Sequence, residues 1–137
     1  MESKQKVLIV DDDEDLLEQL TQILEGAGYE VRTAASQAEG EEMLLSIRPD
    51  LAVFDLMMEE MDSGFMLSHY LKKLYSDVPV ILLTAVTSST GLSFQESSTE
   101  ARSWVKVDEV LDKPVRAEQI KSVVARLLSE VKGAPDG

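Results

Sequence analysis

Three aspartates stand where their side chains can bind a divalent cation and accept a phosphoryl group. Asp11 and Asp12 follow an apolar run at 7–10, and Asp55 follows a second apolar run at 51–54. Two carboxylates about 5 Å apart repel by roughly 3 kcal/mol at an effective dielectric near 20, so a cluster of them needs a cation or a raised pKa. Oxygen ligands of this kind suit magnesium, and a carboxylate can attack phosphorus to give an aspartyl phosphate. Asp55 is therefore the candidate reactive group.

Two further polar residues stand at the ends of predicted strands and can hold phosphate oxygens. Thr84 closes an apolar run at 79–83 and offers a hydroxyl group. Lys113 follows a weaker strand pattern at 107–111 and offers a cation. Open α/β sheets build their ligand sites beyond the carboxyl ends of their strands, so we expect both side chains near the cleft of Asp55.

Strand and helix patterns alternate along the chain. Strands are predicted at 7–10, 29–34, 51–54, 79–83 and 107–111. Helical spacing or a capping signal is found at 14–26, after Ser36, after Ser63 and over 120–131. Central strands that are apolar throughout are typical of a parallel sheet with helices on both faces. With right-handed crossovers, this predicts an α/β fold, a flavodoxin-like (βα)5 three-layer sandwich whose five-stranded parallel sheet has the order 2-1-3-4-5.

The segment at 86–106 does not fit this regular pattern. It is rich in serine and threonine and poorly periodic, so the fourth helix is expected to be short or irregular.

The composition narrows the class of protein. A chain of 137 residues, 44% hydrophobic and 28% charged, is long enough for one soluble globular domain, expected at 5–131 before a flexible tail at 132–137. The net charge of −13 repels nucleic acid and anionic membranes, so neither is an expected partner. The absence of cysteine excludes thiol catalysis, cysteine-ligated metal sites and disulfides. No signal peptide or transmembrane run is recognisable, so a cytoplasmic location is expected.

In their order and spacing, the candidate site residues resemble the motifs of the response-regulator receiver domain. The likeness covers about residues 5 to 131 and is carried by four motifs at strand ends: Asp11-Asp12, Asp55, Thr84-Ala85 and Lys113-Pro114. Each motif alone is weak, but the ordered set is specific.

The resemblance implies a phosphoacceptor chemistry. Asp55 would accept a phosphoryl group from the phosphohistidine of a sensor histidine kinase or of a histidine phosphotransfer protein. Asp12, Asp55 and the backbone carbonyl of Met57 would ligate Mg2+ directly, and Asp11 would act largely through water.

The same resemblance implies a signalling domain and not an enzyme in the usual sense. Thr84 would move toward the phosphoryl group and Lys113 would pair with it. The Lys113–Pro114 peptide bond would be cis, the kind of bond that needs proline. Phosphorylation would change a surface recognised by an unidentified downstream protein, with homodimer formation as a further expectation.

Several positions depart from the family pattern. Glu59 stands where the family usually has proline, and Val110 stands where it commonly has an aromatic switch residue. The unusual segment at 87–106 leaves open a second function, that of a receiver-like interaction module that is never phosphorylated. A phosphatase of the haloacid-dehalogenase type is disfavoured, because it needs an aspartate two residues after its nucleophile and the chain has Met57 there.

Met57 and Val86 predict slow loss of the phosphoryl group from Asp55. By resemblance, these two positions flank the path of the hydrolytic water, and apolar side chains cannot orient that water by hydrogen bonding. The test is to phosphorylate the protein, remove the phosphodonor and follow the decay of the phosphoryl group. The double variant Met57→Asn, Val86→Glu should decay faster, and equal rates in the two proteins would contradict the prediction.

Overall fold

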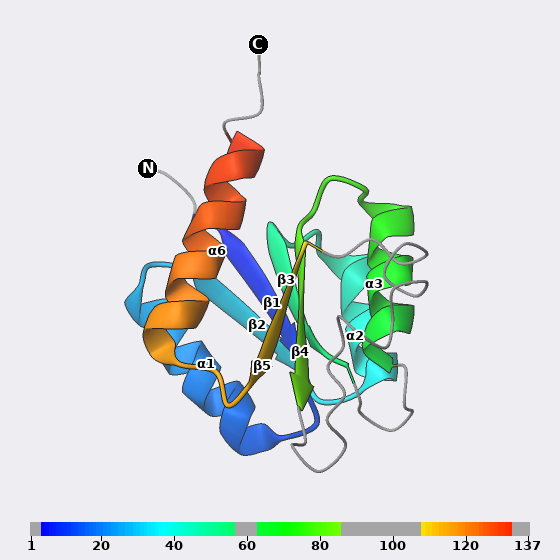
Figure 1. The fold of residues 1–137 in the computed structure, drawn as a ribbon. Coiled ribbons are helices and arrows are strands. Elements are labelled where there is room, and N and C mark those ends of the chain that lie inside the picture. Colours follow the sequence, from blue (N-terminus) through cyan, green and yellow to red (C-terminus); the bar gives the residue numbers. More distant parts are fainter. Residues whose placement is uncertain (1–3, 57–62, 86–107, 133–137) are drawn as a thin grey trace.

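The computed structural model describes residues 4–56, 63–85 and 108–132, which form a sheet between two layers of helix (Figure 1). Helices and strands alternate because the apolar period changes from that of a strand to that of a helix along the chain. In chain order the elements are β1 (Lys6–Val10), α1 (Glu14–Gly26), β2 (Glu30–Ala34), α2 (Gln37–Ser46), β3 (Leu51–Asp55), α3 (Ser63–Leu74), β4 (Val80–Ala85), β5 (Glu109–Lys113) and α6 (Ala117–Lys132).

The five described strands form one sheet in the order β2-β1-β3-β4-β5, and every neighbouring pair is parallel. This confirms the predicted flavodoxin-like order and the three-layer α/β architecture. Because all these strands run in the same direction, their carboxyl ends share one edge of the sheet. Asp55 is the register partner of Leu83, and Ala85 is the register partner of Lys113. The sheet therefore brings the ends of β3, β4 and β5 to one place.

One pair of described helices covers each face of the sheet, α1 and α6 on one face and α2 and α3 on the other (Figure 1). Side chains alternate between the faces along a strand. Leu51 and Val53 of β3 pack with the α1–α6 layer. Ala52 and Phe54 pack with the α2–α3 layer. All five residues of β3 are buried, which explains the continuous apolar run, and the alternation places Asp55 on the α1–α6 face.

β5 begins and ends two residues later than predicted, at Glu109–Lys113 and not at 107–111. Its pairing with β4 continues to Ala85 and Lys113, so Lys113 is the last residue of the strand and not a residue beyond it. β5 lies at an edge of the described sheet and carries the exposed Asp112. A polar residue is tolerated on an edge strand. Because Asp112 is polar, the sequence pattern does not show that the strand continues to Lys113.

Two predicted features lie outside the described residues. The expected irregular fourth helix falls within 86–107, and most of the expected tail falls at 133–137. α6 itself runs to Lys132. Within the described ranges, every helix is too short or too polar to cross a membrane.

Candidate functional site

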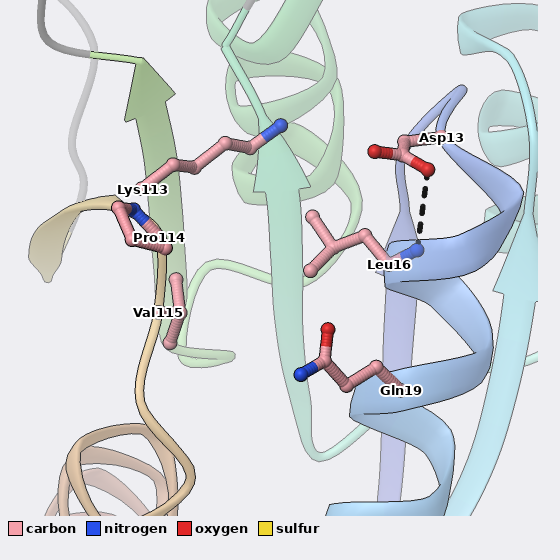
Figure 2. Close-up of a pocket in the computed structure, with 6 residues that line it drawn as sticks. All are labelled: Asp13, Leu16, Gln19, Lys113, Pro114 and Val115. Atoms are coloured by element: carbon pink, nitrogen blue, oxygen red, sulfur yellow. Dashed lines mark hydrogen bonds between the residues drawn. The ribbon is translucent and has the colours of Figure 1, made fainter.

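The three consecutive aspartates after β1 have different surroundings. Asp11 is fully buried, whereas Asp12 beside it is exposed. Asp13 is the N-cap of α1, and its side chain accepts hydrogen bonds from the backbone N–H groups of Asp15 and Leu16 (Figure 2 draws the second). This cap satisfies two donors that a helix start otherwise leaves without a partner. Asp13 therefore serves the helix, and Asp11 and Asp12 remain for the cleft.

Asp11, Asp12 and Asp55 form a carboxylate cluster at the carboxyl edge of the sheet. One side-chain oxygen of each residue lies within 4.8 Å of the other two. Asp55, the last residue of β3, is only 5% exposed. The fold thus brings Asp55 to two acids that lie more than forty residues before it in the chain, as their places at the ends of neighbouring strands predict.

Lys113 supplies the cation of this cluster. Its Nζ atom lies 3.1 Å from Asp11 Oδ2 and 3.2 Å from Asp55 Oδ1. The lysine side chain is 24% exposed, so water screens these ion pairs only in part. One ammonium group against three carboxylates leaves the cleft with a net negative charge.

Burial opposes the ionised form of the two inner acids. It raises the pKa of Asp55 to about 6, and the charge of Asp11 adds to the rise, which Lys113 offsets only in part. Burial also raises the pKa of Asp11, although the N–H of Asp13 donates to Asp11 Oδ1 at 2.9 Å and Lys113 lies close. Burial alone would lower the pKa of Lys113, but the two carboxylates outweigh it and raise that pKa. The cluster is therefore short of positive charge.

The carboxylate cluster fits a divalent cation. Asp11 Oδ2 is buried and, among the described residues, faces the ammonium group of Lys113 at 3.1 Å. Lys113 Nζ also contacts Asp55, so one positive charge serves two buried carboxylates, an arrangement that favours binding of a further cation. The donor set consists of oxygen only, and the exposed Asp12 leaves one side open to water. Such a set suits magnesium better than a softer metal.

Thr84 lies at the same edge of the sheet but on the opposite face. Val80 packs with the α2–α3 layer, and Thr84, 8% exposed, continues the same alternation along β4. Val110 of β5 packs against this layer too, two residues before Asp112, which is the register partner of Thr84. The threonine and the valine at the switch position therefore share a face, whereas Lys113 faces the carboxylates.

An open groove of about 340 Å³ adjoins the carboxylate cluster, between the start of α1 and the loop from β5 to α6 (Figure 2). The Lys113–Pro114 peptide bond in this loop is cis, as the resemblance implies. The groove gives solvent access to Lys113 beside the cap of α1. The residues that line it are Asp13, Leu16, Gln19, Lys113, Pro114 and Val115.

Three residues singled out in the sequence, Met57, Glu59 and Val86, lie outside the described residues. The metal-ligating role of the Met57 carbonyl therefore stays a prediction. So does the effect of Met57 and Val86 on dephosphorylation.

Gly64 contributes to the site although its residue type carries no chemistry. At the start of α3, its backbone N–H donates to Leu56 O at 2.9 Å. A Cβ atom at this position would lie 2.6 Å from Leu56 Cα and 2.7 Å from Asp55 O. Gly64 therefore allows α3 to pack directly on the end of β3. The only signal in the sequence is a glycine at a predicted helix start, which does not reveal so close an approach.

Comparisons with known proteins agree with this geometry. A family model described as the response regulator receiver domain matches residues 7–125. The response regulator MprA of Mycobacterium avium (strain 104) is 32% identical over 131 residues, which cover 96% of this chain and 54% of that protein. A CheY-like response regulator receiver domain protein from Methanospirillum hungatei JF-1 is 28% identical, with a TM-score of 0.82 over 95% of this chain and 98% of that one.

A fourth similarity is to the receiver domain of a signal transduction histidine kinase from Syntrophus aciditrophicus. It is 32% identical, with a TM-score of 0.79, and covers 97% of this chain and 96% of that one. The chain spans about half the length of the curated relatives it matches. The family match begins within β1, ends within α6 and includes Asp11, Asp12, Asp55 and Lys113. The chain therefore belongs to the response regulator receiver domain family, the signalling domains of two-component systems.

Proposed function

We propose that phosphorylation of Asp55 switches this receiver domain in a magnesium-dependent reaction. The observation that carries the proposal is the position of the Asp55 carboxylate, with oxygens of Asp11 and Asp12 within 4.8 Å and Lys113 Nζ at 3.2 Å. One cleft thereby offers a nucleophile, ligands for a divalent cation and a cation for phosphoryl oxygens. Family membership supports a sensor histidine kinase or a histidine phosphotransfer protein as the phosphodonor.

In the proposed reaction, a carboxylate oxygen of Asp55 attacks the phosphorus of a phosphohistidine. The new P–O bond forms as the P–N bond breaks, and the imidazole nitrogen keeps the electron pair of the broken bond. Lys113 exchanges its contact with Asp55 Oδ1 for one with a phosphoryl oxygen. Asp12, Asp55 and the Met57 carbonyl would hold magnesium, with Asp11 acting largely through water, and the bound cation would supply positive charge that stabilises the transferred group.

The switch is proposed to run through Thr84. Its hydroxyl group lies at the edge where Asp55 ends its strand, and the α2–α3 layer covers its face of the sheet. Val110 on that face has no ring to rotate, so movement of Thr84 would repack only a small aliphatic side chain. We infer that the altered surface is read by a protein, including a second copy of the chain, because the net charge of −13 disfavours nucleic acid.

The experiment adds magnesium and acetyl phosphate to the purified chain and measures incorporation of a single acid-stable, base-labile phosphoryl group. The wild type should incorporate it with magnesium and not with EDTA, and Asp55→Asn should not incorporate it at all. Asp112→Asn, which removes an exposed carboxylate from the same edge of the sheet, is the matched control and should behave as the wild type. A wild type that takes up no phosphoryl group would contradict the proposal and favour a non-phosphorylated interaction module.

A further inference from the structure

The surface between α2 and α3 carries a groove that has no part in the phosphorylation site. Figure 1 shows the two helices side by side on the face of the sheet opposite α1 and α6. Leu45, at 66%, is the most exposed of the large hydrophobic side chains that the structure describes. The groove has a volume of about 330 Å³ and is lined by Ala38, Glu39, Glu41, Glu42 and Leu45 of α2 and by Tyr70 of α3.

Close contacts between α2 and α3 hold this α2–α3 groove in shape. A Cβ atom at Gly40 would lie 3.1 Å from Leu67 Cδ2, so the missing side chain lets α2 pack closely on α3. Near the end of α2, Tyr75 Oη donates a hydrogen bond to Leu44 O at 2.7 Å. Helix α2 is thus held against α3 and the residue that follows it near Gly40 and near Leu44. A groove with fixed walls loses little conformational freedom when a ligand binds, which favours affinity.

Three glutamates give the α2 side of the groove a negative charge. Glu39 accepts a hydrogen bond from the backbone N–H of Ala35, and Glu41 accepts one from the side-chain amide of Gln37. Both donors are neutral groups, so neither hydrogen bond pairs its carboxylate with a positive charge. Glu42 is exposed. No basic residue occurs in α2 or among the described residues that line the groove.

We propose that the α2–α3 groove binds a basic amphipathic helix of a partner protein. The apolar ridge of that helix would pack on Leu45 and Tyr70, and lysine or arginine residues flanking the ridge would meet Glu41 and Glu42. A second copy of the chain would bring the same acidic rim and is repelled. The sign of the charge likewise disfavours nucleic acid and an anionic membrane surface.

The first test uses two synthetic helical peptides with the same leucine pattern, one with lysine and one with glutamate at its polar positions. Each is titrated into the full chain labelled with ¹⁵N, and the amide signals are followed by NMR. The lysine peptide should shift signals of α2 and those around Tyr70, and the glutamate peptide should not bind. Shifts confined to other elements would overturn the proposal.

A charge reversal on the groove separates specific binding from general attraction. Glu41→Lys with Glu42→Lys should weaken the affinity for the lysine peptide about tenfold. The matched control is Glu18→Lys with Glu25→Lys, which makes the same change of charge on exposed positions of α1. This control should bind within about twofold of the wild type. Equal losses in the two double variants would mean nonspecific attraction and would overturn the proposal.

The apolar contact is tested at two exposed leucines. Leu45→Ser should weaken binding of the lysine peptide about tenfold, because the anchor loses its apolar partner. Leu74→Ser alters a leucine that is 40% exposed on α3 and does not line the groove, and it should leave the affinity unchanged. An unchanged affinity in Leu45→Ser would overturn the proposal. The proposal would also be overturned if the wild type self-associates and Leu45→Ser abolishes that self-association, because the groove would then bind a second copy of the chain.

Discussion

Replacement of Asp55 by asparagine is expected to abolish phosphoryl incorporation and to raise the free energy of unfolding of the metal-free protein by about 2 kcal/mol at neutral pH. The first effect follows because the side chain loses its nucleophilic carboxylate. The second follows from burial, since Asp55 is 5% exposed and its pKa is raised to about 6. At neutral pH the folded protein must hold this carboxylate ionised beside Asp11. Asparagine has nearly the same shape and removes that repulsion.

The stability gain from Asp55→Asn depends on pH in a defined direction. The pKa of Asp55 is about 6 in the folded protein and about 3.9 in the unfolded chain. Between these values the folded state keeps a proton that the unfolded chain has released, so the free energy of unfolding falls as the pH rises. The cost of the ionised carboxylate is absent at lower pH and complete above the folded-state pKa. The difference between Asp55→Asn and the wild type should therefore be about half as large near pH 5 as above pH 7.

Urea unfolding in EDTA at these two pH values measures this difference. Asp112→Asn is the matched control, because it removes one negative charge from an exposed position of β5. Its free energy of unfolding should stay within about 0.5 kcal/mol of the wild type. A stability of Asp55→Asn equal to that of the wild type at neutral pH would show that burial of the carboxylate is not costly. A difference that does not change with pH would assign it to packing and not to charge.

Magnesium should narrow the difference in stability between the two proteins. A cation bound to the folded state alone stabilises it by about 2.7 kcal/mol at a concentration one hundred times its Kd. The wild type should gain this stability, because the bound cation offsets the repulsion between Asp11 and Asp55. Asp55→Asn has lost a carboxylate ligand and should gain less at the same magnesium concentration. An equal gain in both proteins would place the bound magnesium away from Asp55.

The central strands of the fold could be predicted from the sequence to within two residues. β1, β3 and β4 are covered by helices on both faces, so nearly every residue in them must be apolar. The predicted position of β5 is two residues too early, because a strand at the edge of the sheet need not be apolar throughout. Its Glu109 and Asp112 are compatible with a strand or a loop, and only the pairing with β4 determines where it ends.

The residues of the site could be predicted, but the surroundings of each side chain could not. Asp11 and Asp12 were expected at the site, and the fold adds that Asp13 caps α1 while Asp11 is buried in the cleft. Thr84 was expected near Asp55, and the alternation along β4 places it at the same edge on the other face. In each case the role of the residue depends on the direction in which its side chain leaves the backbone. The functional meaning of that direction depends on which helices pack on which face of the sheet, and the sequence alone does not give this.

Gly64→Ala is expected to lower the free energy of unfolding by about 3 kcal/mol, near the upper end of the usual cost of overpacking. The added Cβ atom would lie 2.6 Å from Leu56 Cα and 2.7 Å from Asp55 O. Both are backbone atoms, which cannot rotate away as the end of a side chain can. Either the start of α3 or the end of β3 must therefore move. Buried Ser68 resists a shift of the helix, because its Oγ donates to Gly64 O at 2.8 Å.

Because Asp55 belongs to the backbone that must move, Gly64→Ala should also weaken magnesium binding, measured as the stability gained on adding magnesium. The matched control is Gly26→Ala at the end of α1, where an added Cβ atom has no neighbour within 4 Å. That substitution should be neutral or should stabilise the protein by up to about 1 kcal/mol, through the higher helix propensity of alanine. The contrary outcome is that Gly64→Ala has the same free energy of unfolding as Gly26→Ala and gains as much stability from magnesium as the wild type. In that case the position of Asp55 does not depend on the contact between α3 and β3. A loss of stability and of magnesium binding in Gly64→Ala alone would show that one absent side chain, nine residues after Asp55, holds the carboxylate in place.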